Sequence, residues 1–505
     1  MLPHTLLYTL FIATSSAAFI PPPRIPTPPK PQIIEPIAPA PAAPNPYRPA
    51  DRPDPEATPG FDAPEMTGGF QAPKPTGSFE VPDVPLPDDQ DETASKVASR
   101  PYGNPAKTLS PAQVAASFAA SKSTATHSTA TPTTGMTVPA TTGGAARIED
   151  VGLGMTLVGF YAAIPAAVAA CTCITLDGIT VPGNSSIDLT KLKTGTKVTF
   201  KGRTFWEYAD ANYAFIKVAG TNVEITAEED AVLDGNGQAW WDGLGSNGGV
   251  AKPNHFIEVK VLGKSSVHDI YIKNYPVHCF SISNSAGLDV HHITLDNSDG
   301  YAPNNRSNGL PAAHNSDGFG LSSTNNTKVR DSVVINQDDC VAVTSGDNIH
   351  VSNMYCNGSH GLSIGSVGGK SNNNVTNISF TNSVVLNAEN GARIKSNSNT
   401  TGFISNIHYE NIRVENISIY GIDIQQDYLN GGPTGNPTNG VIIQNITMKN
   451  IFGTATEEGK NYYILCGEGS CSDIKIDNVR ITGGGEESSC NFKTEGNFDC
   501  DGHFV

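Results

Sequence analysis

The stretch "NQDDC", from Asn336 to Cys340, places two carboxylates side by side directly before an alternating apolar run. A third carboxylate, Asp317, precedes a similar run 22 residues before Asp339, and His360 precedes another run 21 residues after it. Crowded carboxylates push one another's pKa values apart, so that one can stay protonated while another stays ionised. An acid and a base held together in this way are the chemistry of glycosidases.

Two cations, Arg393 and Lys395, lie in a later run of the same kind, "NGARIK". A guanidinium can bind a carboxylate through two parallel hydrogen bonds, and an ammonium binds it as a point charge. Such a pair beside the carboxylates suits an acidic sugar as substrate. Taken alone, "NQDDC" would be an acidic turn and the two cations a solvated strand face. The register that these segments share is what favours a site.

Short apolar alternations recur from about residue 172 onward, separated by Asn, Gly and Ser. A repeat of about 20–30 residues with one strand in common register is typical of a solenoid, whose coils bury their apolar sides by stacking. We therefore predict an all-β fold, a right-handed parallel β-helix, with a β-sandwich of independent strands as the alternative. The segments in register are "HFIEV" from His255, "HCFSI" from His278, "DGFGL" from Asp317, "DCVAV" from Asp339, "HGLSI" from His360, "NGARI" from Asn390 and "YGIDI" from Tyr420.

This register stacks Asp317, Asp339 and His360 as a ladder along one edge of the solenoid, with neighbours about 4.8 Å apart. Strict alternation would point the ladder into the core, where unpaired charges would cost several kcal/mol. We expect a bend before each strand to turn these side chains to the surface instead, and Gly318 and Gly361 would permit it.

The remaining positions of each run divide between the core and the surface. Arg393 and Lys395 have the outward parity, so they should point outward together, and so should Asp423 and Gln425 on the next coil. The apolar positions expected to line the core are Phe319, Leu321, Val341, Val343, Leu362, Ile364, Ala392, Ile394, Ile422 and Ile424.

The composition bounds the class of protein. The chain has 505 residues, enough for one large domain and additional segments, and only 16% of them are charged, which suits a β-rich extracellular protein. The formal net charge of −17 argues against nucleic acid and anionic membranes as partners. An acidic substrate would therefore have to be bound by a local cationic patch.

Four segments follow one another along the chain. Residues 1–18 are typical of a secretory signal, with Ser16 and Ala18 placed for cleavage before Phe19. Residues 19–146 are rich in Pro, Ser and Thr, and we expect a disordered linker there. Residues 147–171 are mainly apolar and could form a helical cap, with a membrane span or a signal-like remnant as alternatives. The β-helix should occupy residues 172–505.

Secretion would favour disulfides, and the chain has nine cysteines. The odd number leaves at least one thiol without a partner in the chain. Glycosylation sequons begin at Asn184, Asn305, Asn325, Asn357, Asn374, Asn377, Asn399, Asn416 and Asn445, and some of them should carry glycan in a secreted protein.

Several ordered motifs resemble the fungal-type endopolygalacturonases of glycoside hydrolase family 28. They are "NSDGF" (315–319), "NQDDC" (336–340), "SHGLSIGSVGG" (359–369) and "ARIK" (392–395), followed by "QQDY" (425–428) and "YILC" (463–466). The resemblance covers roughly residues 172–505. It implies a secreted parallel β-helix enzyme that hydrolyses α-1,4-galacturonosyl bonds within polygalacturonate or pectin, with inversion and without a cofactor or metal.

The resemblance also implies a role for each matching residue. Asp338 resembles the general acid, Asp317 and Asp339 the pair that activates water, and His360 the residue that supports protonation of the acid. Arg393 and Lys395 resemble the residues that bind the substrate carboxylate, and Tyr428 a residue that lines a sugar subsite. The disulfides implied by the family are Cys340–Cys356, Cys466–Cys471 and Cys490–Cys500, which leaves Cys171, Cys173 and Cys279 unassigned.

One departure from the family pattern bears on activity: the family usually has an aspartate where this chain has Gly320. A second departure is small, since Ser359 stands where the family usually has glycine. The sequence leaves open an exo-acting enzyme, a calcium-dependent pectate lyase and a non-catalytic wall-binding protein. We expect a monomer. Trp240 and Trp241, in "DGNGQAWWDG", are expected either to pack inside the protein or to stack on sugar.

Overall fold

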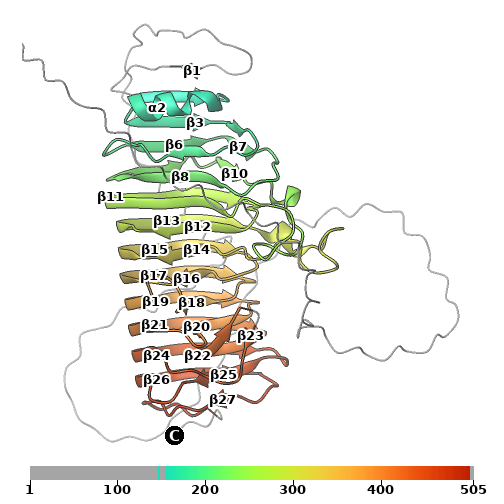
Figure 1. Cartoon of the computed structure of the whole chain (residues 1–505), viewed down its shortest axis with the longest axis vertical. Coiled ribbons are helices and arrows are strands. Elements are labelled where there is room, and N and C mark those ends of the chain that lie inside the picture. Colours follow the sequence, from blue (N-terminus) through green and yellow to red (C-terminus); the bar gives the residue numbers. More distant parts are fainter. Residues whose placement is uncertain (1–145, 148–153, 431, 501–505) are drawn as a thin grey trace, which may run out of the picture. The chain divides into compact units, whose positions relative to one another are not determined.

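The computed structural model describes residues 154–430 and 432–500, together with the backbone of Ala146–Arg147. The expected signal, at residues 1–18, and the expected linker up to residue 145 lie outside the described residues. The described chain winds as a stack of parallel coils (Figure 1), which confirms the predicted β-helix. Among these residues, no helix is both long enough and apolar enough to cross a membrane.

One parallel sheet of short strands carries most of the motifs and is called the site sheet below. Each coil contributes one strand, and the strands pair in the order of the chain. Its strands are β5 (Ile187–Leu189), β8 (Ala214–Thr221), the first part of β11 (His255–Lys273), β12 (His278–Ser283), β14 (Phe319–Ser322), β16 (Val341–Val343), β18 (Leu362–Val367), β20 (Asn390–Asn397), β22 (Tyr420–Leu429), β25 (Lys460–Leu465) and β27 (Ser489–Cys490).

A second series of parallel strands forms the opposite wall of the solenoid, again one for each coil, and these strands are long from β13 onward. They are β2 (Gly154–Val158), β3 (Cys173–Asp177), β6 (Lys197–Lys201), β9 (Glu224–Ala227), the later part of β11, β13 (Ala286–Asp296), β15 (Thr324–Ile335), β17 (Gly346–Asn357), β19 (Asn374–Leu386), β21 (Gly402–Ile417), β24 (Val441–Ala455) and β26 (Cys471–Thr482). The remaining strands are β1 (Ala146–Arg147), β4 (Thr180–Val181), β7 (Arg203–Trp206), β10 (Val232–Asp234) and β23 (Gly432–Pro433).

Asparagine ladders shape the bends of the long strands. Asn382, Asn411 and Asn450 all have positive φ, a conformation that asparagine tolerates better than most residues. Each side chain hydrogen-bonds the next, since the Asn411 amide donates to Asn382 Oδ1 at 3.1 Å and that of Asn450 to Asn411 Oδ1 at 3.1 Å. The Asn-rich texture of the sequence therefore stacks the bends of successive coils upon one another.

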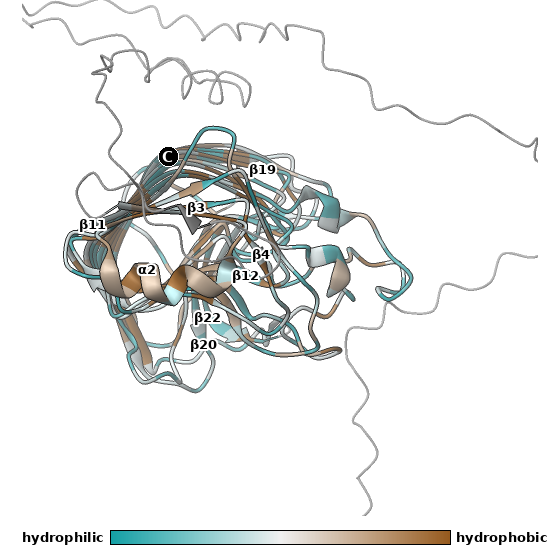
Figure 2. Ribbon diagram, turned by 90° about the horizontal axis from the view of Figure 1, so that it is seen from above, coloured by the Kyte–Doolittle hydropathy of each residue, from teal (hydrophilic) through white to brown (hydrophobic). Residues whose placement is uncertain are grey.

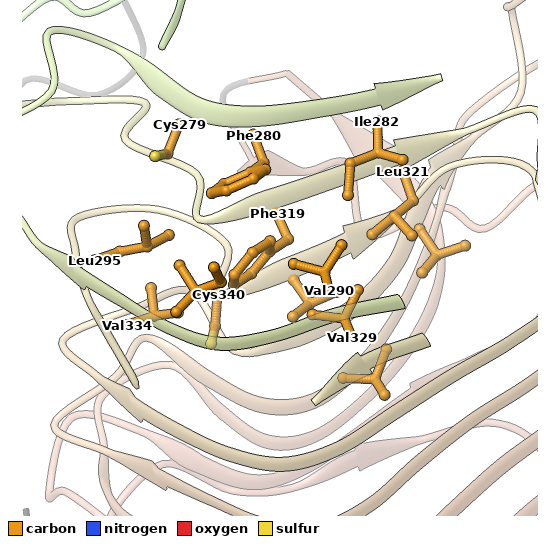
Figure 3. Packing of buried hydrophobic residues seen from close by; sticks show 14 of the residues in the cluster. Cys279, Phe280, Ile282, Val290, Leu295, Phe319, Leu321, Val329, Val334 and Cys340 are labelled. Carbon is orange, nitrogen blue, oxygen red and sulfur yellow. The ribbon is translucent and has the colours of Figure 1, made fainter. Parts of the chain in front are cut away.

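The register predicted from the repeats is the observed one. Phe319 pairs with Val341, Val341 with Leu362, Leu362 with Ala392, and Ala392 with Ile422. All ten apolar residues predicted to line the core are buried. Figure 3 shows part of this packing, in which the rings of Phe280 and Phe319 lie against each other; their centroids are 4.9 Å apart.

The expected cap segment, residues 147–171, contains both a strand and a helix. Strand β2 pairs in parallel with β3, so the described solenoid begins at Gly154 rather than at residue 172. After the 3-10 turn η1 (Tyr161–Ala163), helix α2 (Ile164–Ala170) lies across this end of the stack (Figure 2). Ile164, Ala167 and Val168 are its buried residues, and they cover the first coil.

Two long connections on one side of the site sheet matter for the site. The first follows β10 and contains the 3-10 turn η2 (Gly237–Ala239), Trp240 and Trp241. Both tryptophans are buried, so they pack inside the protein and do not offer a face for sugar. The second contains the 3-10 turn η3 (Ser298–Tyr301) and leads into β14.

The three disulfides implied by the family are present. They are Cys340–Cys356, Cys466–Cys471 and Cys490–Cys500. The first ties the coil of Asp338 and Asp339 to strand β17, which leads toward His360. Cys171, Cys173 and Cys279 are free.

Candidate active site

The carboxylate cluster lies at the N-terminal ends of strands of the site sheet, where each chain segment enters its strand. Asp317, Asp339 and His360 each come two residues before the first paired residue of β14, β16 and β18. The predicted alignment of Asp317, Asp339 and His360 on successive coils is therefore confirmed. Asp317, Asp338 and Asp339 each place a carboxylate oxygen within 4.8 Å of the others.

The bend that turns these side chains outward uses its glycines in two ways. Gly361 has φ +95°, and a Cβ there would lie 2.4 Å from Asn390 O, so the position requires glycine on both grounds. Gly318 does not have a positive φ. It is needed for space instead, because its Cβ would lie 2.6 Å from Cys340 O.

Asp338 is held by donors on both of its oxygens. Its Oδ1 accepts a hydrogen bond from the Asp339 backbone N–H at 2.7 Å and lies 3.1 Å from His360 Nδ1. Its Oδ2 accepts from the Asn315 side-chain amide at 3.1 Å. His360 thus pairs with Asp338, and not with Asp339, its neighbour in the ladder. On its other side, His360 Nε2 lies 3.2 Å from Glu389 Oε2.

Asp339 is held differently from its neighbour. Ser363 Oγ donates to its Oδ1 at 2.7 Å, and Lys395 Nζ donates to its Oδ2 at 3.0 Å. Arg393 lies 3.9 Å from the same carboxylate. The two adjacent aspartates therefore contact different cations, Asp338 the imidazole and Asp339 the ammonium and guanidinium.

Asp317 has one engaged oxygen and one open one. Its Oδ1 lies 2.9 Å from His278 Nδ1. The described residues make no hydrogen bond to its Oδ2. The Asp317 carboxylate is partly exposed at the surface of the site sheet, so its Oδ2 is available to a water molecule or a sugar hydroxyl.

Arg393 and Lys395 point away from the solenoid core, as their parity predicts, but they are not solvated. Only 8% of Arg393 and 5% of Lys395 is exposed. The Arg393 Nε–H donates to Asp423 Oδ2 at 3.2 Å, on the next coil. Asp423 and Gln425, which we also expected to point outward, are fully covered. The outer face of these coils is thus a second, polar layer of packed side chains.

Tyr428 completes the cationic side of the site. Its ring centroid lies 5.5 Å from the Arg393 guanidinium carbon and 5.2 Å from Lys395 Nζ. A tyrosine ring at this distance attracts both cations through its negative face. All seven residues predicted for catalysis and substrate binding therefore lie in one continuous site.

The charges of this site decide where its protons reside. Burial would raise the pKa of Asp338, but the charge of His360 outweighs it and holds that pKa well below its ordinary value. Burial would lower the pKa of His360, but Asp338 and Glu389 raise it well above its ordinary value. Burial, with the adjacent Asp338, raises the pKa of Asp317. Without substrate, the shared proton thus belongs to His360 and Asp338 is ionised.

Four site residues were missed in the sequence. His278 occupies the same template position as Asp317 in "HCFSI", so the register already carried that signal. Ser363 is in register with Arg393, which the repeat also implied. Asn315 and Glu389 lie in the turns before β14 and β20, where the alternation of a strand does not predict which way a side chain points.

A divalent cation could be held by the three carboxylates on geometry alone. A cationic side chain already lies against each of them: His278 at Asp317, His360 at Asp338 and Lys395 at Asp339. The negative charge of the cluster is thus balanced by protein groups, and the site does not need a metal ion for charge balance. Two hollows, of about 480 and 490 Å³, lie elsewhere and are lined by none of the three carboxylates.

Comparison with known proteins agrees with this geometry. "Probable endopolygalacturonase D" from Neosartorya fischeri is 56% identical over 336 residues, 66% of this chain and 71% of that protein. "Endopolygalacturonase D" from Aspergillus niger is 51% identical over 389 residues, 74% of this chain and 78% of that protein. The structure of endopolygalacturonase I from Stereum purpureum with two galacturonates aligns with a TM-score of 0.58 and 28% identity, over 65% of this chain and 95% of that one.

The family model "Glycosyl hydrolases family 28" matches residues 171–498. This range contains every residue of the carboxylate cluster and every cation that contacts it. Because the match covers more than half of the sequence and the site is complete within it, the chain belongs to glycosyl hydrolase family 28 and is a glycosidase.

Proposed function

We propose that this chain hydrolyses α-1,4-galacturonosyl bonds within polygalacturonate and pectin. The observation that carries the proposal is the single site in which three carboxylates adjoin Arg393 and Lys395. Carboxylates alone suit any glycosidase, whereas two buried cations beside them suit a sugar that is itself a carboxylate. Relatives at 51–56% identity are named endopolygalacturonases, which supports the same substrate and cleavage within the chain.

The reaction proceeds by a direct displacement. Asp338 gives its proton to the glycosidic oxygen, the bond from that oxygen to the anomeric carbon breaks, and the leaving sugar departs as an alcohol. Water attacks the anomeric carbon from the opposite face, and Asp317 with Asp339 accepts its proton. The open Oδ2 of Asp317 is the oxygen that contacts the water, while Asp339 remains bound to Lys395 and Ser363.

Protonation of Asp338 accompanies substrate binding. In the free site the shared proton resides on His360, which lies 3.1 Å from Asp338 Oδ1. A galacturonate carboxylate that binds Arg393 and Lys395 neutralises cations that depress the pKa of Asp338, and it adds a negative charge nearby. Both effects move the proton from His360 toward Asp338, where the leaving oxygen needs it.

The stereochemical outcome is inversion. The carboxylate oxygens lie within 4.8 Å of one another, closer than the roughly 6.5–9.5 Å between carboxyl groups that is usual for inverting enzymes. Inversion is therefore proposed from family membership and not from spacing. Proton NMR of the first products should show the β-anomer; the α-anomer as first product would contradict it.

Gly320 is not among the residues that hold Asp317, Asp338 or Asp339 through side-chain hydrogen bonds. It lies in β14 between Ser281 and Ala342 of the adjacent coils, and the nearest atom to a Cβ there would be Phe280 O at 3.4 Å. A Cβ atom is therefore accommodated in ordinary van der Waals contact, so glycine is not required at this position for lack of space. We propose that the chain is active despite this departure from the family pattern.

The remaining parts of the proposal concern the whole protein. We propose that residues 1–18 direct secretion and are removed, that residues 19–146 act as a linker, and that the enzyme works as an extracellular monomer. The reaction uses only protein groups and water, so it needs no cofactor. Neither nucleic acid nor a membrane is expected as a partner of a chain with this net charge.

The test is the release of reducing ends from polygalacturonate in mildly acidic buffer with a chelator present. Reducing ends without new ultraviolet absorbance support hydrolysis, whereas an unsaturated product that the chelator abolishes indicates a lyase. Sizing the products over time separates random oligomers, from endo action, from monomer alone, from exo action. Binding of polygalacturonate without any new reducing ends would indicate a non-catalytic wall-binding protein.

A further inference from the structure

A loop outside the site sheet, residues 242–252, is braced from within by a buried ion pair. Lys252 Nζ lies 2.9 Å from Asp242 Oδ2 and also donates to Gly248 O at 2.7 Å. The side chains of Lys252 and Asp242 are only 3% and 8% exposed. A buried lysine that bonds a carboxylate and backbone carbonyls of one loop fixes the shape of that loop.

The braced loop holds the side chain of Asn315. The backbone N–H and the hydroxyl of Ser246 both donate to Asn315 Oδ1, each at 3.1 Å. With its carbonyl oxygen facing these two donors, the Asn315 amide must present its NH₂ group to the other side. There it donates to Asp338 Oδ2 at 3.1 Å.

Close backbone contact joins the same two segments. Gly245 has φ +52°, and a Cβ at this position would lie 2.3 Å from His314 O and 2.7 Å from Asn315 Oδ1. Only glycine fits there without moving the loop away from Asn315. Asn247 and His314 add a further contact, with their side-chain nitrogens 3.2 Å apart.

We propose that the 242–252 loop positions the general acid, because it holds Asn315 and Asn315 in turn fixes the orientation of the Asp338 carboxyl group. The proposal rests on the proposed hydrolysis with Asp338 as the acid. His360 and the Asp339 N–H hold Oδ1, so Asn315 is what keeps the carboxyl group from rotating about its own axis. Asn315 is a positioning residue, since it acts through Asp338.

The test compares two glycine substitutions that share a backbone strain and differ in contact. Gly245→Ala pushes the loop off His314 and Asn315. Gly178→Ala is the matched control, because Gly178 has φ +62° but no atom lies within 4 Å of its Cβ position. Gly245→Ala should lower kcat on the order of tenfold or more, as expected for a misplaced catalytic group, and leave KM nearly unchanged. Gly178→Ala should leave both as in the wild type.

The pH profile separates positioning from damage to the fold. The Asn315 amide stabilises the ionised form of Asp338, so its loss lets the acid keep its proton to higher pH. The alkaline limb of kcat should therefore move to higher pH in Gly245→Ala. Asn315→Gly, which tolerates φ +51° and removes the amide outright, should move it further in the same direction.

Two results would overturn the proposal. One is a Gly245→Ala enzyme that behaves like Gly178→Ala in kcat and in pH profile. The other is a loss of kcat in both Gly245→Ala and Asn315→Gly with the alkaline limb unmoved, which a merely structural role would give. A wild-type protein that releases no reducing ends would instead refute the proposed function.

Discussion

Asp338 is the residue on which the proposed chemistry depends most directly. Asp338→Asn keeps the shape of the side chain but removes the transferable proton. Loss of a general acid typically lowers the rate by about 10²–10⁴-fold, so we expect kcat on polygalacturonate to fall in that range. Binding should persist, because Arg393 and Lys395 are unchanged. Reducing-end assays with Asp347→Asn, an aspartate on the opposite wall, provide the control. Activity near the wild-type level would remove Asp338 from the acid role.

Glu389 sets the pH at which His360 loses the shared proton. Its carboxylate lies 3.2 Å from His360 Nε2 and contributes to the raised pKa of that imidazole. Glu389→Gln should lower the pKa of His360, so that the alkaline limb of kcat moves to lower pH. This is opposite in sign to the shift expected for Gly245→Ala.

A matched control exists for this substitution. Glu410 also pairs with a histidine, His408, at 2.9 Å, but it lies on β21 away from the site. Glu410→Gln should leave the pH profile unchanged. If Glu389→Gln moves the limb to higher pH, or not at all, His360 is not the proton reservoir of Asp338.

Strand β22 contributes a buried carboxyl group whose ionisation opposes folding. Burial raises the pKa of Asp423 to about 7, against the favourable charge of Arg393. A carboxyl group with a raised pKa in the folded state adds stability that is complete below its unfolded pKa, near 3.8, and is lost as pH rises through about 7. Wild-type stability should therefore decline between about pH 4 and pH 7 on account of this residue.

Asp423→Asn should remove that decline. As pH rises from 4 to 7, the unfolding free energy of the variant should increase relative to that of the wild type by on the order of 2–4 kcal/mol. Equilibrium urea unfolding of both proteins at several pH values would measure this change. Asp289→Asn, at a partly exposed carboxylate paired with Arg330, is the control. If the unfolding free energy of the variant falls relative to that of the wild type as pH rises, ionisation of Asp423 does not destabilise the folded protein.

The strands were predictable, and the turns between them were not. Period-2 alternation and repeat length predicted both the register from Phe319 to Ile422 and the core side chains, because burying one face of a strand fixes its alignment. The same pattern predicted that Arg393 points outward, but not that Asp423 and Tyr428 cover it. Partners such as Asn315 and Glu389 enter from turns, whose direction depends on contacts with distant loops such as residues 242–252.

At the scale of the whole molecule, the solenoid fixes distances that a more flexible fold would not. The site takes one set of residues from each of several consecutive coils, from His278 on β12 to Asp423 on β22. The coil spacing of about 4.8 Å sets the separation between these sets. A slip of one residue in any coil would send its charged residues into the core. The disulfide Cys340–Cys356 restrains the coil where the two aspartates adjoin.

The net charge of the chain opposes its proposed substrate at long range, while the local cations attract it at short range. Asp and Glu number 49 against 32 Lys and Arg, for a net charge of −17, and polygalacturonate is a polyanion. Raising the ionic strength from 0.01 M to 0.15 M shortens the Debye length from about 30 Å to about 8 Å. The long-range repulsion should weaken, whereas contacts to the nearly buried Arg393 and Lys395 should be screened little. KM for polygalacturonate should therefore fall over this range while kcat stays constant.

Highly methyl-esterified pectin, which carries few charges, should show a smaller change in KM. A KM that rises with salt would mean that surface cations steer the substrate and that the overall charge has no influence on its approach.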